Sequence, residues 1–126
     1  MKKQAKFTLK SRLNSFYFAF SGLKTVFNEE ANFRIHLIAA GFAVLLGLLL
    51  KITKFEWISI VFAIGIVFVS EIINSSIERL ADIISPEKNQ KIKKLKDLSA
   101  AAVLVSAITA LIIGLIIFLP KLLTIL

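Results

Sequence analysis

Polar and acidic side chains recur along one face of a stretch that is otherwise strongly apolar. Residues 71–82 read EIINSSIERLAD. At 3.6 residues per helical turn, this spacing gathers Glu71, Ser75, Glu78 and Asp82 on one side, with Asn74 beside them. An ionisable group inside a membrane helix costs at least ~2.5–3.5 kcal/mol and is a functional hypothesis by default. Glu71 is the deepest of these residues, and no basic residue stands one turn away along the helix.

Two other acidic positions stand where apolar stretches begin. Glu29 and Glu30 precede the first stretch, and Lys96 and Asp97 precede the last. In a helical bundle, we expect these junctions to meet residues 71–82 at one depth. Carboxylates and an amide, in a chain with one His and no Cys, suit a hard cation such as Mg²⁺. Nearby Lys and Arg side chains suit a polyphosphate.

Some of these carboxylates have a simpler interpretation. Asp82 and Glu87 lie near the end of the predicted helix, where water can solvate them. They can also pair with Arg79 or with the lysines of residues 88–96. For these two residues, the structural interpretation is at least as good as the functional one.

The composition requires a membrane. The chain has 126 residues, of which 57% are hydrophobic, against ~45–50% in soluble domains. Its mean hydropathy is +0.83. Apolar stretches at 35–50, 57–70 and 98–120 lie within predicted helices 33–51, 55–84 and 91–120, each long enough to span a bilayer. The prediction is an all-α membrane protein with one domain, residues 1–126.

The N-terminal segment forms a further helix in this prediction, residues 6–28. Its apolar residues recur every three or four positions, from Leu9 to Phe27. Such a helix can lie in the core of a bundle or along the membrane surface. The basic residues that precede it favour the surface.

Basic residues also indicate the topology. The net charge is +8, and the basic residues concentrate before residue 35 and between residues 79 and 96. The positive-inside rule then places the N-terminus and the 79–96 connection in the cytoplasm of a multi-pass inner-membrane protein. The same distribution argues against nucleic-acid binding, because these charges flank spans and no recognition motif accompanies them.

The pattern Glu-x-Ile-Asn-Ser-Ser-Ile-Glu-x-x-Ala-Asp at 71–82 resembles the signature of the small bacterial integral-membrane lipid kinases. These are the prokaryotic diacylglycerol kinases and their undecaprenol kinase relatives. Three further blocks are similar in order and spacing: Gly22-Leu23, Glu30-Ala-Asn-Phe-Arg34 and a block from Lys96-Asp97 to Val103. The resemblance covers nearly the whole chain.

The resemblance implies a homotrimer that transfers the γ-phosphoryl group of ATP, with Mg²⁺, to the hydroxyl of a membrane lipid alcohol. That alcohol is undecaprenol or diacylglycerol. By position, Glu71 is similar to the family's catalytic base, and Glu30 and Glu78 to its metal ligands and ATP contacts. The other implied residues contact ATP (Lys96, Asp97 and Arg12) or support the site and substrate (Asn74, Arg34 and Ser75).

Some positions leave alternatives open. Glu29 adjoins Glu30, so either residue can be the first metal ligand. His36 stands where the enterobacterial branch has Glu, which favours a polyprenol substrate; we interpret it as an interfacial, hydrogen-bonded residue rather than a catalyst. A different class, a small channel or transporter subunit, would use the acidic row as an ion path. Only Ser59 is polar between residues 57 and 69, which argues against such a path.

Overall fold

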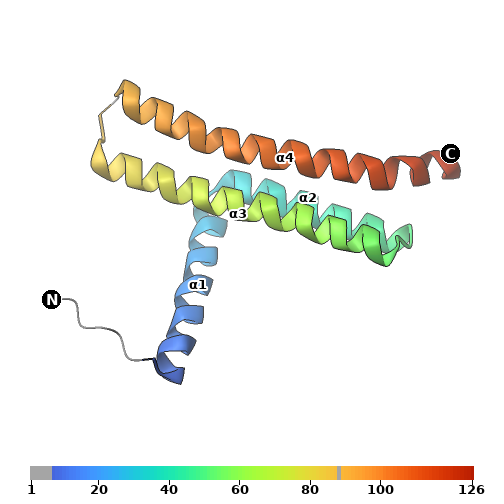
Figure 1. Cartoon of the computed structure of the whole chain (residues 1–126), viewed down its shortest axis with the longest axis horizontal. Helices are drawn as coiled ribbons and strands as arrows, with labels where there is room; N and C mark the ends of the chain where they lie inside the picture. The colour runs from blue at the N-terminus through green and yellow to red at the C-terminus, as the bar shows by residue number, and fades with distance from the viewer. Residues whose placement is uncertain (1–6, 88) are drawn as a thin grey trace.

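The computed structural model describes residues 7–87 and 89–126, and these residues form four helices. They are α1 (Leu9–Glu29), α2 (Ala31–Leu49), α3 (Lys54–Ile84) and α4 (Gln90–Ile125). Three of them, α2, α3 and α4, are long and apolar enough to cross a membrane. They run side by side, whereas α1 leaves the bundle at a steep angle (Figure 1). The predicted all-α membrane fold is confirmed. The predicted helix start at residue 6, and the basic residues before it, lie outside the described residues.

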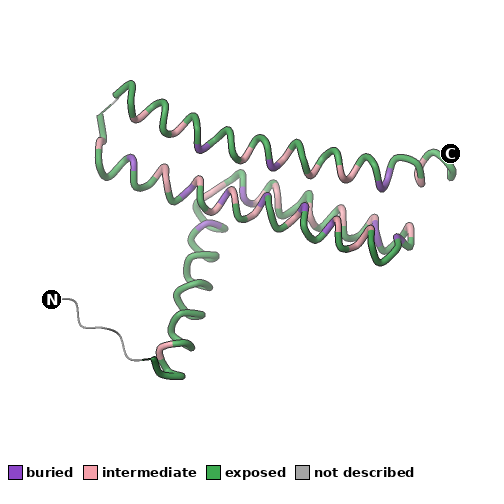
Figure 2. Tube along the Cα trace, in the orientation of Figure 1, coloured by how far each residue is buried: buried purple, intermediate pink, exposed green. Residues whose placement is uncertain are grey.

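The first helix is almost entirely exposed. Thr8 caps α1 through a reciprocal pair of hydrogen bonds with Ser11. Val26 is the one residue of α1 that this chain buries, and Figure 2 shows nearly all the rest of the helix as exposed, with Ser11 intermediate. Its large apolar side chains, such as Phe16 and Phe20, face outward. The helix therefore takes no place in the core of this chain's bundle, which agrees with the membrane-surface interpretation.

One residue forms the joint between α1 and α2. Glu30 has an extended backbone (φ −113°, ψ 108°) and caps both helices. Nη1 of Arg34 donates to the carbonyl oxygens of Phe27 (2.7 Å) and Asn28 (3.0 Å). These carbonyls are left without partners at the end of α1. Arg34 therefore holds the corner, and α2 begins at Ala31 rather than at the predicted residue 33.

The turn between α2 and α3 is fixed by backbone geometry. Lys51 has φ 50°, a left-handed conformation common just after a helix. The N–H of Ile52 donates to the carbonyl of Gly47 at 3.2 Å, and the Ile52 side chain is only 7% exposed. Thr53 and Glu56 then form a capping box that starts α3.

The last helix continues past the point where the sequence predicts its end. We expected a stop at residue 120, but α4 runs through Pro120 to Ile125. Proline removes one helical hydrogen bond, so the last turns need other support. Lys121 pairs with Glu56 at 3.2 Å, and Leu122 packs against the buried cluster around Ile52 and Phe118. These contacts hold α4 to the start of α3.

Gly47 tests how tightly the bundle is packed at its α2–α3 turn. A methyl group added there would lie 2.8 Å from Cη2 of Trp57, whereas one added at Gly41 on the same helix meets nothing within 4 Å. We expect Gly47→Ala to lower the free energy of unfolding by about 1–3 kcal/mol, as overpacking does. Gly41→Ala should leave it equal or slightly higher. Thermal unfolding in detergent micelles measures both, and equal midpoints would contradict this packing.

Candidate active site

Glu71, Ser75, Glu78 and Asp82 form a polar row on α3, and this row contacts the joint between α1 and α2. Oγ of Ser75 donates to Oε1 of Glu30 at 2.9 Å. Ser75 is only 6% exposed, so this hydrogen bond is shielded from solvent. Two residues 45 positions apart in the sequence are therefore joined, as the expectation of junctions at a common depth requires.

Glu71 has a basic partner from another helix. Nε2 of His36, on α2, lies 3.3 Å from Oε1 of Glu71, and the Glu71 side chain is 4% exposed. The sequence alone shows no basic residue near Glu71 along α3, because the partner comes from across the bundle. The interpretation of His36 as an interfacial residue did not include this contact.

Arg79 connects α3 to both acidic residues of the α1–α2 joint. Its Nη2 donates to Oε2 of Glu29 and, at 3.4 Å, to Oε1 of Glu30. The sequence analysis gave Asp82 and Glu87 either Arg79 or the lysines of 88–96 as partners. For Asp82 the lysine alternative is confirmed, because Asp82 pairs with Lys96, whereas Arg79 pairs across the bundle. Glu29 thus pairs with Arg79, whereas Glu30 also reaches the buried Ser75.

A second set of contacts brings α4 to the same row. Oγ of Ser99 donates to Oδ1 of Asn74 at 2.6 Å. The amide of Asn74 in turn lies 3.5 Å from Oε1 of Glu78. Asn74 therefore links α4 to a predicted metal ligand. The sequence analysis missed Ser99; its position two residues after Asp97, at the start of an apolar stretch, is the signal that could have found it.

Lys96 and Asp97 lie nearer to the α3–α4 connection than the rest of the site does. Lys96 pairs with Asp82, and Nζ of Lys93 lies 2.7 Å from Asp97. The depth expectation is therefore only partly correct: Lys96 reaches the row at Asp82, its end nearest the connection, and Ser99 reaches Asn74 beside the row, whereas Asp97 pairs within its own helix. Lys96 and Asp97 also line a cavity of about 460 Å³, whose other lining residues are Asp82, Ser85, Pro86, Glu87, Asn89, Gln90, Ile92 and Lys93.

Arg12 is not brought to these residues within one chain. It lies near the start of α1, with its guanidinium 5.2 Å from the centre of the Phe7 ring. That end of α1 points away from the bundle (Figure 1). At 1.5 Å per residue, Arg12 and Glu30 are roughly 27 Å apart along the helix. The predicted ATP contact of Arg12 gains no support from this geometry.

The donor set suits Mg²⁺. Mg²⁺ is usually held by one or two carboxylates together with phosphate oxygens and waters. Glu30 docks on Ser75, and Glu78 follows Ser75 on the same helix within one turn. Within the described ranges, no group of three or more His, Asp or Glu side chains forms a complete metal cage. The carboxylates of Glu30 and Glu78 fit this pattern, because they would leave the remaining coordination positions of the metal to phosphate oxygens and waters.

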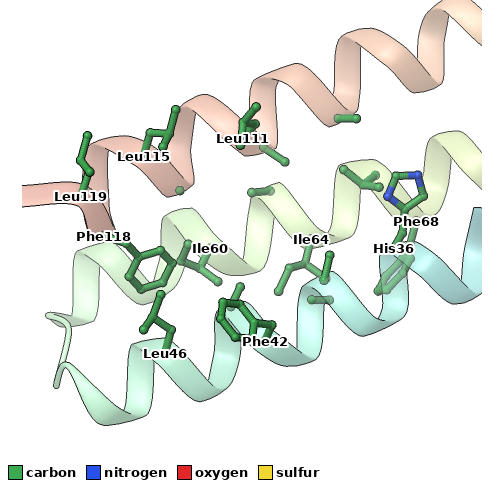
Figure 3. A pocket seen from close by; sticks show the side chains of 18 of the residues that line it. His36, Phe42, Leu46, Ile60, Ile64, Phe68, Leu111, Leu115, Phe118 and Leu119 are labelled. Atoms are coloured by element: carbon green, nitrogen blue, oxygen red, sulfur yellow. The ribbon is translucent and has the colours of Figure 1, made fainter. Parts of the chain in front are cut away.

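An apolar cavity of about 420 Å³ opens between α2, α3 and α4. Figure 3 shows His36 and Phe68 at one end, with Phe118, Leu119 and Leu46 at the other. His36 is the one lining side chain with a ring nitrogen or charge; the rest are apolar, including Ala39, Ala110 and Gly114. The cavity therefore runs through the membrane-spanning part of the bundle and ends beside the partner of Glu71.

Comparison with known proteins decides the family. The family model of the prokaryotic diacylglycerol kinases matches residues 17–118. The chain belongs to this family. An undecaprenol kinase of Bacillus subtilis is 37% identical over 117 residues, which cover 90% of this chain and 95% of that protein. A diacylglycerol kinase of Escherichia coli K12 is 30% identical over 95 residues, covering 75% and 78%. A diacylglycerol kinase of Helicobacter pylori strain 26695 is 33% identical over 99 residues, covering 79% and 77%.

Membership confirms the family resemblance, and the protein is a membrane lipid kinase. The roles of individual residues stay predictions. The structure adds contacts that restrict them: Glu30, Ser75 and Arg79 form one cluster, and Asn74, Ser99 and Glu78 form a second beside it.

Two adjacent serines test the docking of Glu30. Ser75→Ala removes a buried donor to a carboxylate, and we expect the free energy of unfolding to fall by about 1–2 kcal/mol. Ser76→Ala removes a hydroxyl that donates to the Ile72 carbonyl of its own helix. This variant should change the free energy of unfolding by less than about 0.5 kcal/mol. Denaturant unfolding in micelles compares the two variants. Equal losses would mean that the Ser75–Glu30 contact contributes nothing.

Proposed function

We propose that this lipid kinase transfers the γ-phosphoryl group of ATP to the hydroxyl of a lipid alcohol at the cytoplasmic membrane surface. The products are ADP and the lipid phosphate. The observation that carries the proposal is Glu71, a nearly buried carboxylate on a membrane-spanning helix, one turn from the Ser75–Glu30 contact. A lipid hydroxyl can be reached only near this depth, and the chain presents a proton acceptor there.

Phosphoryl transfer depends mostly on positioning and on neutralising charge, with a base that orients the hydroxyl. We assign the base to Glu71. As the lipid oxygen bonds to the γ-phosphorus, its proton passes to the Glu71 carboxylate, the bond to the bridging oxygen breaks and ADP leaves. Asn74, Ser75 and Arg34 support the site: Asn74 links Ser99 to Glu78, Ser75 holds Glu30, and Arg34 holds the α1–α2 corner.

We assign Glu30 and Glu78 as the residues that would hold Mg²⁺. When bound, Mg²⁺ would supply positive charge that offsets the negative charge of the phosphates. The contacts favour Glu30 over Glu29, because Glu30 is docked on the buried Ser75 whereas Glu29 is exposed and pairs with Arg79. Arg79 limits the repulsion between these two carboxylates.

The cavity of about 460 Å³ beside the α3–α4 connection suits the nucleotide. Lys96 and Asp97 line it, together with polar side chains from the end of α3, and Lys96 supplies a positive charge for a phosphate. We retain Arg12 as a nucleotide contact from the family resemblance alone. It would require a second chain or a different placement of α1.

Undecaprenol is our first choice of substrate, and diacylglycerol is the alternative. The undecaprenol kinase of B. subtilis is matched at 37% identity over 95% of its length, whereas the diacylglycerol kinases of E. coli and H. pylori are matched at 30% and 33%. His36, where the enterobacterial branch has Glu, favours the same choice.

We propose a homotrimer in the bacterial inner membrane, with the N-terminus and the α3–α4 connection in the cytoplasm. The outward faces of all three spans carry large exposed apolar side chains, for example Leu45, Phe62 and Leu104. Lipid and neighbouring subunits would cover them. The alternative of an ion-conducting subunit loses support, because α3 turns Ile60, Ala63 and Val67 toward the bundle and so presents no polar path there.

Glu71→Gln tests the base. It preserves shape but removes the proton acceptor, so we expect kcat to fall by at least ~100-fold. The measurement is transfer of labelled phosphate from ATP in mixed micelles that contain the lipid alcohol. Glu56→Gln is the matched control, since it changes a carboxylate of the same helix at the opposite end, and it should retain activity. Full activity in Glu71→Gln would remove this assignment.

The same assay tests the substrate. With undecaprenol and diacylglycerol presented separately at equal mole fractions in micelles, we expect a higher kcat/KM for undecaprenol. A clear preference for diacylglycerol would reverse the choice while leaving the lipid kinase activity intact.

A further inference from the structure

Glu71 lies in surroundings that oppose a free carboxylate. Its side chain is 4% exposed. Glu30, which docks on Ser75 one turn away, and Glu78, two turns away on the same helix, carry the same sign of charge. Arg79, the nearest guanidinium on α3, pairs with Glu29 and Glu30 instead. On α4, Lys96 and Asp97 pair with Asp82 and Lys93. The basic contact of Glu71 therefore comes from His36.

Aromatic packing between α2 and α3 fixes the place of His36. The Phe33 ring, three residues earlier on α2, packs on the Phe68 ring of α3 with centroids 5.1 Å apart. Phe33 itself is buried. Phe68 lies one turn before Glu71 on α3, so the aromatic pair aligns the two helices just where His36 faces Glu71. The imidazole also borders the apolar cavity (Figure 3).

We propose that His36 is the positioning residue for Glu71 in the phosphoryl transfer, an inference that rests on the proposed function. The imidazole N–H at Nε2 holds Oε1 and leaves the second oxygen, Oε2, to accept the proton of the lipid hydroxyl. The proton moves from that hydroxyl to Oε2 as the oxygen–phosphorus bond forms and ADP departs. His36 does not touch the reacting atoms; it sets the orientation of the group that does.

This role predicts a specific kinetic signature. A misoriented base slows the chemical step without weakening the binding of lipid or ATP, so the loss should fall on kcat and not on KM. The effect should also depend on Glu71, because two residues that act as one unit are not additive. The neighbouring cavity offers room for an added small molecule to replace a missing imidazole.

The experiment compares His36→Ala, His36→Gln and the control Ile38→Ala, which alters an exposed side chain of α2. Wild-type transfer from MgATP to undecaprenol and diacylglycerol is measured first; no transfer to either alcohol would refute the proposed function itself. For His36→Ala we expect kcat lowered ~10–100-fold, with both KM values within about 2-fold. His36→Gln keeps an N–H donor and should lose less, and Ile38→Ala should match wild type.

Two further readouts separate positioning from structure. Added imidazole should restore part of the kcat of His36→Ala and leave Ile38→Ala unchanged. In a Glu71→Gln background, His36→Ala should cause no further loss. With an active wild type, the inference is overturned by undiminished kcat in His36→Ala, by a loss additive with Glu71→Gln, or by a lack of imidazole rescue. If His36→Ala does not fold, His36→Gln carries the test: a change in KM alone, or a kcat loss additive with Glu71→Gln, would overturn it.

Discussion

Carboxylates on a helix that crosses hydrocarbon need partners, and this requirement organises the end of the bundle where α1, α2 and α3 meet. A single unpartnered charge there costs at least ~2.5–3.5 kcal/mol. The chain satisfies Glu71 from α2 through His36, and Glu30 from α3 through Ser75 and Arg79. Because each pair joins different helices, the contacts that keep these charges tolerable also define how α1, α2 and α3 fit together.

The two ends of the bundle are held by different interactions. At the end with the α2–α3 turn, apolar packing dominates, with Gly47 against Trp57 and the Ile52 cluster, supplemented by the Glu56–Lys121 ion pair. At the end with the α1–α2 joint, hydrogen bonds and ion pairs dominate. Between them α2 and α4 separate around the apolar cavity. A lipid kinase needs this division, since its donor is water-soluble and its acceptor is not.

Sequence reasoning predicted what depends on one helix at a time. The length of the apolar stretches gave the three spans, and the helical repeat correctly placed Ser75 on the face that meets Glu30. It could not give contacts that depend on how one helix is rotated against another. The His36–Glu71 and Arg79–Glu29 pairs are of this kind. The continuation of α4 past Pro120 was missed for a similar reason, because its support comes from Glu56 on α3.

The single-residue joint at Glu30 has a consequence for where the reaction can occur. In the proposed arrangement, with α1 along the surface and α2 across the bilayer, Glu30 lies at the level where the headgroups meet the hydrocarbon. Glu78 stands two turns from Glu71, ~10 Å along α3, which is comparable to the ~5–8 Å depth of one headgroup layer. Since Glu30 docks on Ser75, midway between them, Glu71 lies on the lipid side of this level and Glu78 on the water side. In the proposed mechanism, one helix thus presents a proton acceptor to the lipid and a phosphate-binding carboxylate to the water side.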